Sequence, residues 1–172
     1  IYEYIGVINL GKFQLPFLIL ATGLLINATN YIDGVDGLLL TFFACCLGYY
    51  IFLIEDSNTI YLIKLLLIPV ILNLILNLLP FKSKIKFFSG NSGSLFVGFF
   101  VSFLTIELYN SFNIHPVYLI WPLWYPVYDF LFVSTNRAVL KKSIFSADNS
   151  HLHHKVLIKF KNDHIKTISL YF

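Results

Sequence analysis

Charged residues, cysteines and methionines are all scarce in this sequence. Only 12% of its 172 residues are charged, about half the share of a typical soluble domain, whereas 58% are hydrophobic and 18% are aromatic. Together with a mean hydropathy of +0.76, this composition excludes a soluble globular domain and predicts an integral membrane protein. The net charge of +3 is spread over loops and matches no nucleic-acid motif, so we expect no nucleic-acid partner.

The few cysteines and the absent methionine carry further information. Cys45 and Cys46 are adjacent within an apolar run, which argues against a stapling disulfide or a metal-binding pair. We interpret them as lipid-facing or packed thiols. Methionine is absent, and Ile1 does not open a secretory signal sequence, so we expect the sequence to be part of a longer protein.

Long apolar stretches dominate the chain and approach the roughly 20 residues that a helix needs to cross a bilayer. They lie at about 15–32, 38–54, 60–79, 94–109 and 116–140. The sequence therefore predicts an all-α, polytopic protein with about five transmembrane helices. We expect residues 1–172 to form a single membrane-embedded domain.

Basic residues cluster in two of the segments that lie outside these stretches. Lys82, Lys84 and Lys86 separate the third and fourth stretches. Other basic residues follow the fifth stretch: Arg137, Lys141, Lys142, Lys155, Lys159, Lys161 and Lys166. By the positive-inside rule, the loops near 80–94 and 140–165 are cytoplasmic, and counting spans back adds the loop near 27–37. Three polar segments are thus expected to share one face of the membrane.

The first polar segment reads NATNYIDGVDGL, from Asn27 to Leu38. Asp33 and Asp36 could be ordinary turn residues, and Asp36 could cap the following helix. We favour a functional role, because charged side chains at the end of a membrane span are costly. Neighbouring carboxylates suit Mg²⁺, and Asn27 and Asn30 could orient a sugar or a base. Phosphoryl transfer would use such a set.

The second polar segment is a run of small residues that opens the fourth apolar stretch. Its amides and hydroxyls could approach a phosphate closely, although a flexible connector or a close-packed helix start would also explain it. The run consists of Gly90, Asn91, Ser92, Gly93 and Ser94.

Asn77, at the end of the third apolar stretch, has two interpretations. It could bind substrate. With Asn73 it also forms an i, i+4 amide pair that could hydrogen-bond between helices.

The third polar segment contains three of the five histidines. His151, His153 and His154 lack the spacing of a zinc site, so we favour hydrogen bonding to a diphosphate or proton transfer, with a solvated loop as the alternative.

Asp129 and several prolines stand out in the fifth apolar stretch. An acid there needs a partner, for which Arg137 is one candidate. Pro116, Pro122 and Pro126 favour a break or a kink, because proline lacks a backbone donor.

Taken in order, these segments resemble the polyprenyl-phosphate N-acetylhexosamine-1-phosphate transferases. The NxxNxxDGxDGL signature corresponds to Asn27–Leu38, a glycine- and serine-rich turn to Gly90–Ser94, and the HxHH loop to His151–His154. Further similarity lies in Asn77 with Pro80, and in Pro126, Asp129 and Arg137. The resemblance covers almost the whole chain and implies that it is the C-terminal part of a longer helical fold.

The resemblance implies a reaction in which N-acetylhexosamine 1-phosphate passes from a UDP-N-acetylhexosamine to undecaprenyl phosphate, with release of UMP. Mg²⁺ is the implied cofactor, the bilayer is a partner, and a homodimer is left open. The implied place is the bacterial inner membrane, in cell-wall or surface polysaccharide synthesis, with the active site facing the cytoplasm. The implied catalytic residues are Asp33, Asp36, His151, His153 and His154. The implied substrate-binding residues are Asn27, Asn30, Asn77, Gly90, Ser92, Gly93 and Ser94, and the implied metal ligands are Asn91 and Asp36.

Two departures separate this sequence from that family. Asn91 stands where the family has a metal-binding aspartate, so metal affinity should be lower. The family's acidic D-D loop, which lies upstream, is absent, and we expect this chain alone to be inactive. A non-catalytic membrane binding or assembly protein is therefore an alternative. A transporter that uses Asp33, Asp36 and Asp129 is a third reading, but it does not explain the ordered motifs.

Overall fold

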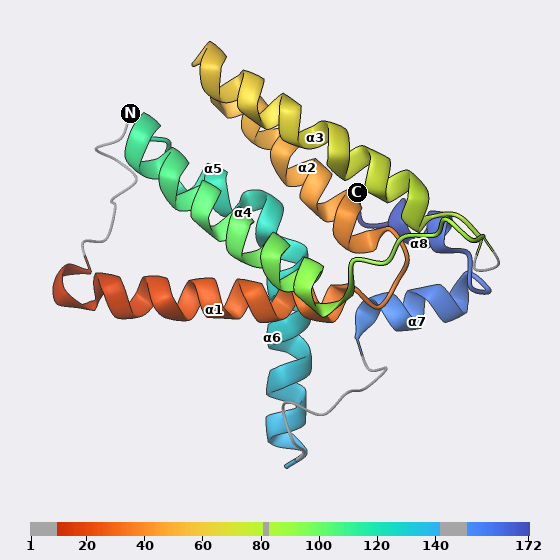
Figure 1. Cartoon of the computed structure of the whole chain (residues 1–172). Coiled ribbons are helices and arrows are strands. Elements are labelled where there is room, and N and C mark those ends of the chain that lie inside the picture. Colours follow the sequence, from red (N-terminus) through yellow and green to blue (C-terminus); the bar gives the residue numbers. More distant parts are fainter. Residues whose placement is uncertain (1–9, 81–82, 142–150) are drawn as a thin grey trace.

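The described residues fold into helices and the loops that join them. The computed structural model describes residues 10–80, 83–141 and 151–172, and Figure 1 shows their arrangement. Lys82 and Lys142, which entered the topology prediction, lie outside the described residues. The helices are η1 (Gly11–Phe13), α1 (Gln14–Ile32), α2 (Leu38–Leu53), α3 (Ser57–Asn77), α4 (Gly90–Phe112), α5 (Pro116–Ile120), η2 (Trp121–Leu123), α6 (Trp124–Val139), α7 (Leu152–Lys159) and α8 (His164–Ile168). The all-α fold class is thus confirmed.

Three helical segments are long and apolar enough to cross a membrane. They are Gly11–Ile32, Ser57–Asn77 and Gly90–Phe112. The second predicted span forms the shorter apolar helix Leu38–Leu53. The described residues therefore support three candidate spans and one shorter helix, and not the five that the sequence predicted.

The fifth apolar stretch accounts for part of this difference. It does not form one helix but is divided into α5, η2 and α6. Pro116 begins α5 and Pro122 lies in η2, while Pro126 lies in the first turn of α6. Each proline lacks an N–H donor and restricts the preceding residue, so a continuous helix is interrupted where they recur. The predicted break is present, but it leaves the segment without a single spanning helix.

Helices α1 and α4 cross at very short range beside Gly98 of α4. A Cβ atom at this position would lie 2.3 Å from Thr29 Oγ1 and 2.6 Å from Ile26 Cα. The Thr29 hydroxyl also lies 3.0 Å from the carbonyl oxygen of Ser94, one turn earlier in α4. Small residues let helix backbones approach each other in this way in membrane proteins. The crossing fixes the start of α4 against the end of α1.

A second tie joins α2 to α4 and α5 at the opposite end of the molecule. The buried Tyr50 hydroxyl donates to the Leu119 carbonyl oxygen over 2.9 Å and lies 2.8 Å from Thr105 Oγ1. The α2–α3 connection lies at the same end, where the Asp56 carboxylate caps α3 by accepting the N–H of Thr59. These contacts hold the helices along their length and leave the other end for the polar loops.

The polar segments gather at one end of the molecule. Figure 1 shows that α1 ends, α2 begins, α3 ends and α4 begins on the side where α7 and α8 also lie. This is the arrangement that the three motifs require for a shared site.

We expect Gly98→Ala to destabilise the protein by about 1–3 kcal/mol, because the new methyl group would force α1 and α4 apart. Thermal unfolding of the purified protein in detergent would measure the change. Gly48→Ala in α2 is the matched control, since no atom lies within 4 Å of a Cβ placed there. Equal stability of the two variants would contradict the close crossing.

Candidate functional site

The turn between α1 and α2 is the centre of the candidate site. It contains Asp33, Gly34, Val35, Asp36 and Gly37, and Gly37 has a left-handed φ of +80°. A Cβ atom at Gly37 would lie 2.7 Å from the Leu78 side chain and 2.8 Å from that of Ile168. The left-handed backbone therefore favours glycine at position 37, and a larger residue would also require the Leu78 and Ile168 side chains to shift.

Asn77 ties this turn to the loop before α4. The Gly37 N–H donates to Asn77 Oδ1, and Asn77 Nδ2 donates to the Phe87 carbonyl oxygen over 2.7 Å. The side chain is buried, so both ends of its amide serve backbone groups that would otherwise lack a partner. This geometry gives Asn77 a structural task between loops, and its binding of substrate stays a prediction.

The Asp36 carboxylate forms an ion pair with Lys86, which lies in the loop before α4. Its backbone N–H donates to His164 Nδ1 over 3.1 Å, and the same nitrogen lies 3.9 Å from the carboxylate. Helix α2 begins after Gly37 without a side-chain cap, so Asp36 is not the cap that a simple turn would use. Asp36 instead links the turn after α1 to the loop before α4, through the ion pair with Lys86, and to the start of α8, through the hydrogen bond to His164.

Asp33 occupies a position that is unfavourable for an ionised acid. It follows the last residue of α1, where the helix dipole disfavours negative charge. Burial, together with the nearby charge of Asp36, raises the pKa of Asp33 to about 6. An acid with a pKa near neutrality at the end of a span is a typical functional group.

The start of α4 meets α1 through buried polar contacts. Asn30 Nδ2 donates to Ser94 Oγ over 2.8 Å, which joins the first motif to the second. By contrast, Asn91 and Ser92 are exposed on the first turn of α4, beside Gly90 with its φ of +60°. The side chain of Asn27 is exposed as well and donates to the Gly23 carbonyl oxygen of its own helix.

The histidine segment lies directly against the turn after α1. A Cβ atom at Gly34 would lie 2.8 Å from the His154 ring and 3.2 Å from His153 Nε2, so a larger residue would require the histidine rings to shift. Tyr31 stacks on His151 with ring centroids 4.8 Å apart. The third motif therefore packs on the first, although more than 100 residues separate them in sequence.

Asp129 of α6 anchors the histidine segment. Its Oδ2 lies 2.8 Å from His151 Nδ1, and its Oδ1 accepts the Leu152 N–H over 2.9 Å. The sequence had suggested Arg137 as a candidate partner, but the structure pairs Asp129 with His151 because α7 begins beside α6. Within the described residues, the buried Nε2 atoms of His151 and His153 have no hydrogen-bond partner.

Sequence reasoning did not identify several residues of this site. Lys86 had been assigned only a topological role, His164 carried no signal, and Tyr31 lies inside the first motif without being singled out. Each contributes through a contact between elements distant in sequence. The only signal in the sequence that could have identified them as site residues is their aromatic or basic character.

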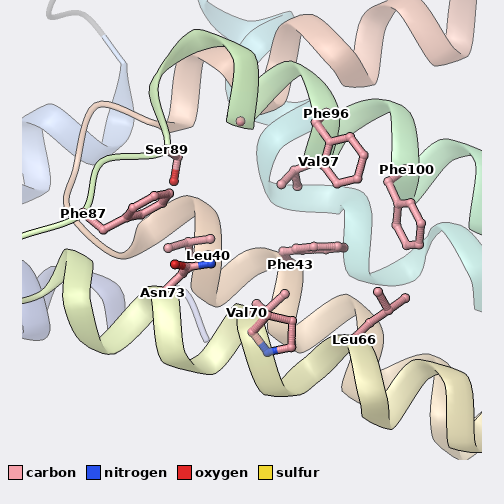
Figure 2. A pocket seen from close by; sticks show the side chains of 12 residues that line it. Leu40, Phe43, Leu66, Val70, Asn73, Phe87, Ser89, Phe96, Val97 and Phe100 are labelled. Atoms are coloured by element: carbon pink, nitrogen blue, oxygen red, sulfur yellow. The ribbon is translucent and has the colours of Figure 1, made fainter.

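An apolar groove of about 260 Å³ runs between α2, α3 and α4 near the start of α4 (Figure 2). Asn73 and Ser89 contribute polar side chains to its lining. Gly93 has no side chain, and the other lining residues are apolar. The groove is lined by Leu40, Phe43, Leu66, Pro69, Val70, Asn73, Phe87, Ser89, Gly93, Phe96, Val97 and Phe100. An apolar lining is unsuited to binding phosphate, so the groove is not part of the polar site.

The described residues fit a magnesium ion only in part. Asp33 and Asp36 supply two carboxylates, but Lys86 already pairs with Asp36. Within residues 10–80, 83–141 and 151–172, no group of three acids, histidines or cysteines is arranged to hold a metal. Mg²⁺ is commonly bound through one or two carboxylates with water and substrate phosphates, so the acids could supply only the protein's share.

Comparison with known proteins identifies relatives of this chain. The family model described as "Glycosyl transferase family 4" matches residues 2–109. The undecaprenyl-phosphate alpha-N-acetylglucosaminyl 1-phosphate transferase of Yersinia pestis is 29% identical over 86% of this chain and 42% of its own length.

Two further relatives give the same picture. A probable undecaprenyl-phosphate N-acetylglucosaminyl 1-phosphate transferase of Bacillus subtilis is 29% identical over 87% of this chain and 42% of its own. A decaprenyl-phosphate N-acetylglucosaminephosphotransferase of Mycobacterium tuberculosis is 29% identical over 89% and 43%. The chain thus spans about two fifths of the length of these relatives. No solved structure matches it.

We expect Asp33→Asn to stabilise the protein at pH 8 and to have little effect at pH 4. The folded state raises the pKa of Asp33, so its ionised form opposes folding once the pH exceeds about 6. Thermal unfolding of the purified protein at the two pH values would measure the difference.

Asp56→Asn is the matched control for this measurement. Hydrogen bonds from Thr59 lower the pKa of Asp56, so this acid should stabilise the fold at pH 8 and lose that effect as the pH falls. The two variants should therefore shift stability in opposite directions at pH 8. A shared direction would contradict the environment described for Asp33.

Proposed function

The chain belongs to glycosyl transferase family 4, and we propose that it forms part of an enzyme that transfers N-acetylhexosamine 1-phosphate from a UDP-sugar to undecaprenyl phosphate. UMP and a lipid-linked diphosphate sugar would be the products. The observation that carries this proposal is the meeting of three remote segments: Asp36 with Lys86, Asn30 with Ser94, and Gly34 with His154. The names of the relatives supply the class of reaction.

In this proposal, cationic and hydrogen-bonding groups hold the phosphates. The unpartnered Nε2 atoms of His151 and His153 would donate to oxygens of the UDP-sugar diphosphate, together with His154. Lys86 would add positive charge beside Asp36. Such groups accelerate phosphoryl transfer by positioning the reactants and by spreading the charge that develops in the transition state.

The acidic turn would serve the attacking phosphate and the metal. Asp33, with its pKa of about 6, could accept a proton or orient the acceptor when it is ionised. Asp36 would hold Mg²⁺, with Asn91 as a weaker amide ligand. The ion would neutralise charge on the reacting phosphates. Asn27, Asn30, Asn77 and the run from Gly90 to Ser94 would contact the nucleotide and sugar.

The proposed place of this reaction is the cytoplasmic face of a bacterial inner membrane. Three helices are long and apolar enough to cross a membrane, and the polar loops gather at one end of them. Basic residues in the loops at that end support the orientation through the positive-inside rule. A soluble UDP-sugar and a membrane-bound phosphate can both reach such a face.

A second function is favoured by one observation, the amide of Asn91 where the resemblance places an aspartate. A member of the family with weakened metal binding could act as a membrane binding or assembly protein. In that case it would still bind the UDP-sugar but would not turn it over.

The assay for the proposed reaction uses the full-length protein in detergent with UDP-N-acetylglucosamine, undecaprenyl phosphate and Mg²⁺. We expect Mg²⁺-dependent release of UMP that falls as the pH is lowered through about 6, because Asp33 must be ionised. Asp33→Asn should lower the rate on the order of 10²-fold. UDP-sugar binding without release of UMP would instead support the binding protein.

Asn91→Asp tests the weakened metal site. The added carboxylate should lower the Mg²⁺ concentration for half-maximal UMP release roughly tenfold, because ligand charge tunes affinity for hard cations. Asn110→Asp, an exposed position near the other end of α4, is the control and should leave this concentration unchanged. An unchanged Mg²⁺ requirement in Asn91→Asp would show that another carboxylate holds the ion.

A further inference from the structure

Asp129 makes two hydrogen bonds that differ in kind. Its Oδ1 accepts the Leu152 N–H over 2.9 Å, and its Oδ2 lies 2.8 Å from His151 Nδ1. Asp129 is 2% exposed and His151 is 3% exposed, so the contact between the two side chains is buried. The carboxylate joins α6 to the first residues of the histidine segment.

This pairing decides which nitrogen of His151 carries a proton. An ionised carboxylate can only accept hydrogen bonds, so His151 Nδ1 must be the donor in this contact. The proton of the neutral imidazole is then on Nδ1, and Nε2 keeps its lone pair. A carboxylate that fixes a histidine in this way also stabilises the imidazolium that forms when Nε2 takes a proton.

Two neighbouring rings also stack with the ring of His151. Tyr31 stacks on it with centroids 4.8 Å apart and an interplanar angle of 26°. The ring of His153 lies at 5.4 Å and 18°. His151 Nε2 is buried and has no hydrogen-bond partner among the described residues, so the ring is oriented while one of its polar atoms is left for a ligand.

We propose that Asp129 is a positioning residue that fixes the proton of His151 on Nδ1 and presents Nε2 to a phosphate oxygen of the UDP-sugar. This inference rests on the proposed function for the identity of the ligand. When the phosphate binds, Nε2 takes up one proton from solvent and donates a charge-assisted hydrogen bond, while the Nδ1 proton stays directed at Asp129. His153, whose Nδ1 is 3.6 Å from the same carboxylate oxygen, is not fixed in this way.

Asp129→Asn separates this role from simple packing. Asparagine keeps the size of the side chain but has one acceptor oxygen and one donor NH₂ group. The backbone N–H of Leu152 can only donate, so it should retain the oxygen and leave the NH₂ group facing His151 Nδ1. His151 would then carry its proton on Nε2 as a neutral ring, and its hydrogen bond to a phosphate would lack the positive charge of an imidazolium donor.

The experiment reads the proton position directly. Nitrogen-15 spectra of the full-length protein labelled in histidine distinguish protonated from unprotonated ring nitrogens, and His151→Gln assigns the signals of His151. We expect the proton on Nδ1 in the wild type and on Nε2 in Asp129→Asn. UDP-N-acetylglucosamine should shift the His151 Nε2 signal of the wild type.

Kinetics supply the second measurement. In Asp129→Asn the KM for UDP-N-acetylglucosamine should rise about tenfold, as expected when the donor of the hydrogen bond to the phosphate loses its positive charge. A variant that only folded less well would lower kcat and leave KM unchanged. Asp129→Glu keeps the carboxylate and should restore the Nδ1 proton and part of the affinity. Asp56→Asn, another carboxylate that accepts a backbone N–H, should change neither.

Several outcomes would overturn this role. They are a proton on His151 Nε2 in the wild type, a proton that stays on Nδ1 in folded Asp129→Asn, an unchanged KM in that variant, or no shift of His151 with the UDP-sugar. The wild-type spectra remain decisive if Asp129→Asn does not fold. Absence of UMP release by the wild type would contradict the proposed reaction alone, since the spectra need no turnover.

Discussion

The turn between α1 and α2 must satisfy its backbone donors at the end of an apolar helix, and the rest of the site depends on how it does so. Asn77 accepts the Gly37 N–H, and His164 accepts the Asp36 N–H. These acceptors come from the end of α3 and the start of α8, so satisfying the turn also places both elements. A buried donor without a partner would cost about 1–3 kcal/mol, which is enough to select this arrangement.

The same turn carries groups whose placement opposes folding. Asp33 is an acid at the C-terminal end of a helix, partly buried and close to a second acid, and all three features disfavour its charge. Gly34 and Gly37 have no side chains to pack, and this lets the side chains of His154 and Leu78 approach the backbone of the turn. Proteins retain such costs where a function requires them, and here they coincide with the residues that the motifs identified.

The sequence predicted the helices and the meeting of the motifs better than it predicted the contacts within the site. The first two apolar stretches match α1 and α2 closely, whereas α4 begins four residues earlier than its apolar stretch because Gly90 and Asn91 are polar positions of the helix. The prolines signalled a break after residue 116 but not that the segment would be divided among α5, η2 and α6. Contacts such as Asp129 with His151 and Asp36 with Lys86 depend on tertiary packing, which no local pattern encodes.

The charge balance of the site gives Asp33 a particular weight. Asp36 is paired with Lys86, and Asp129 is committed to His151 and to the Leu152 N–H. With an amide at position 91, Asp33 is the acid of the three motifs that has no cationic partner among the described residues. Its negative charge is therefore the one in these motifs that no cation of the described residues balances, and burial with the nearby charge of Asp36 raises its pKa to about 6. In the proposed reaction, the net charge that this turn presents to the phosphates would thus depend on the ionisation of Asp33.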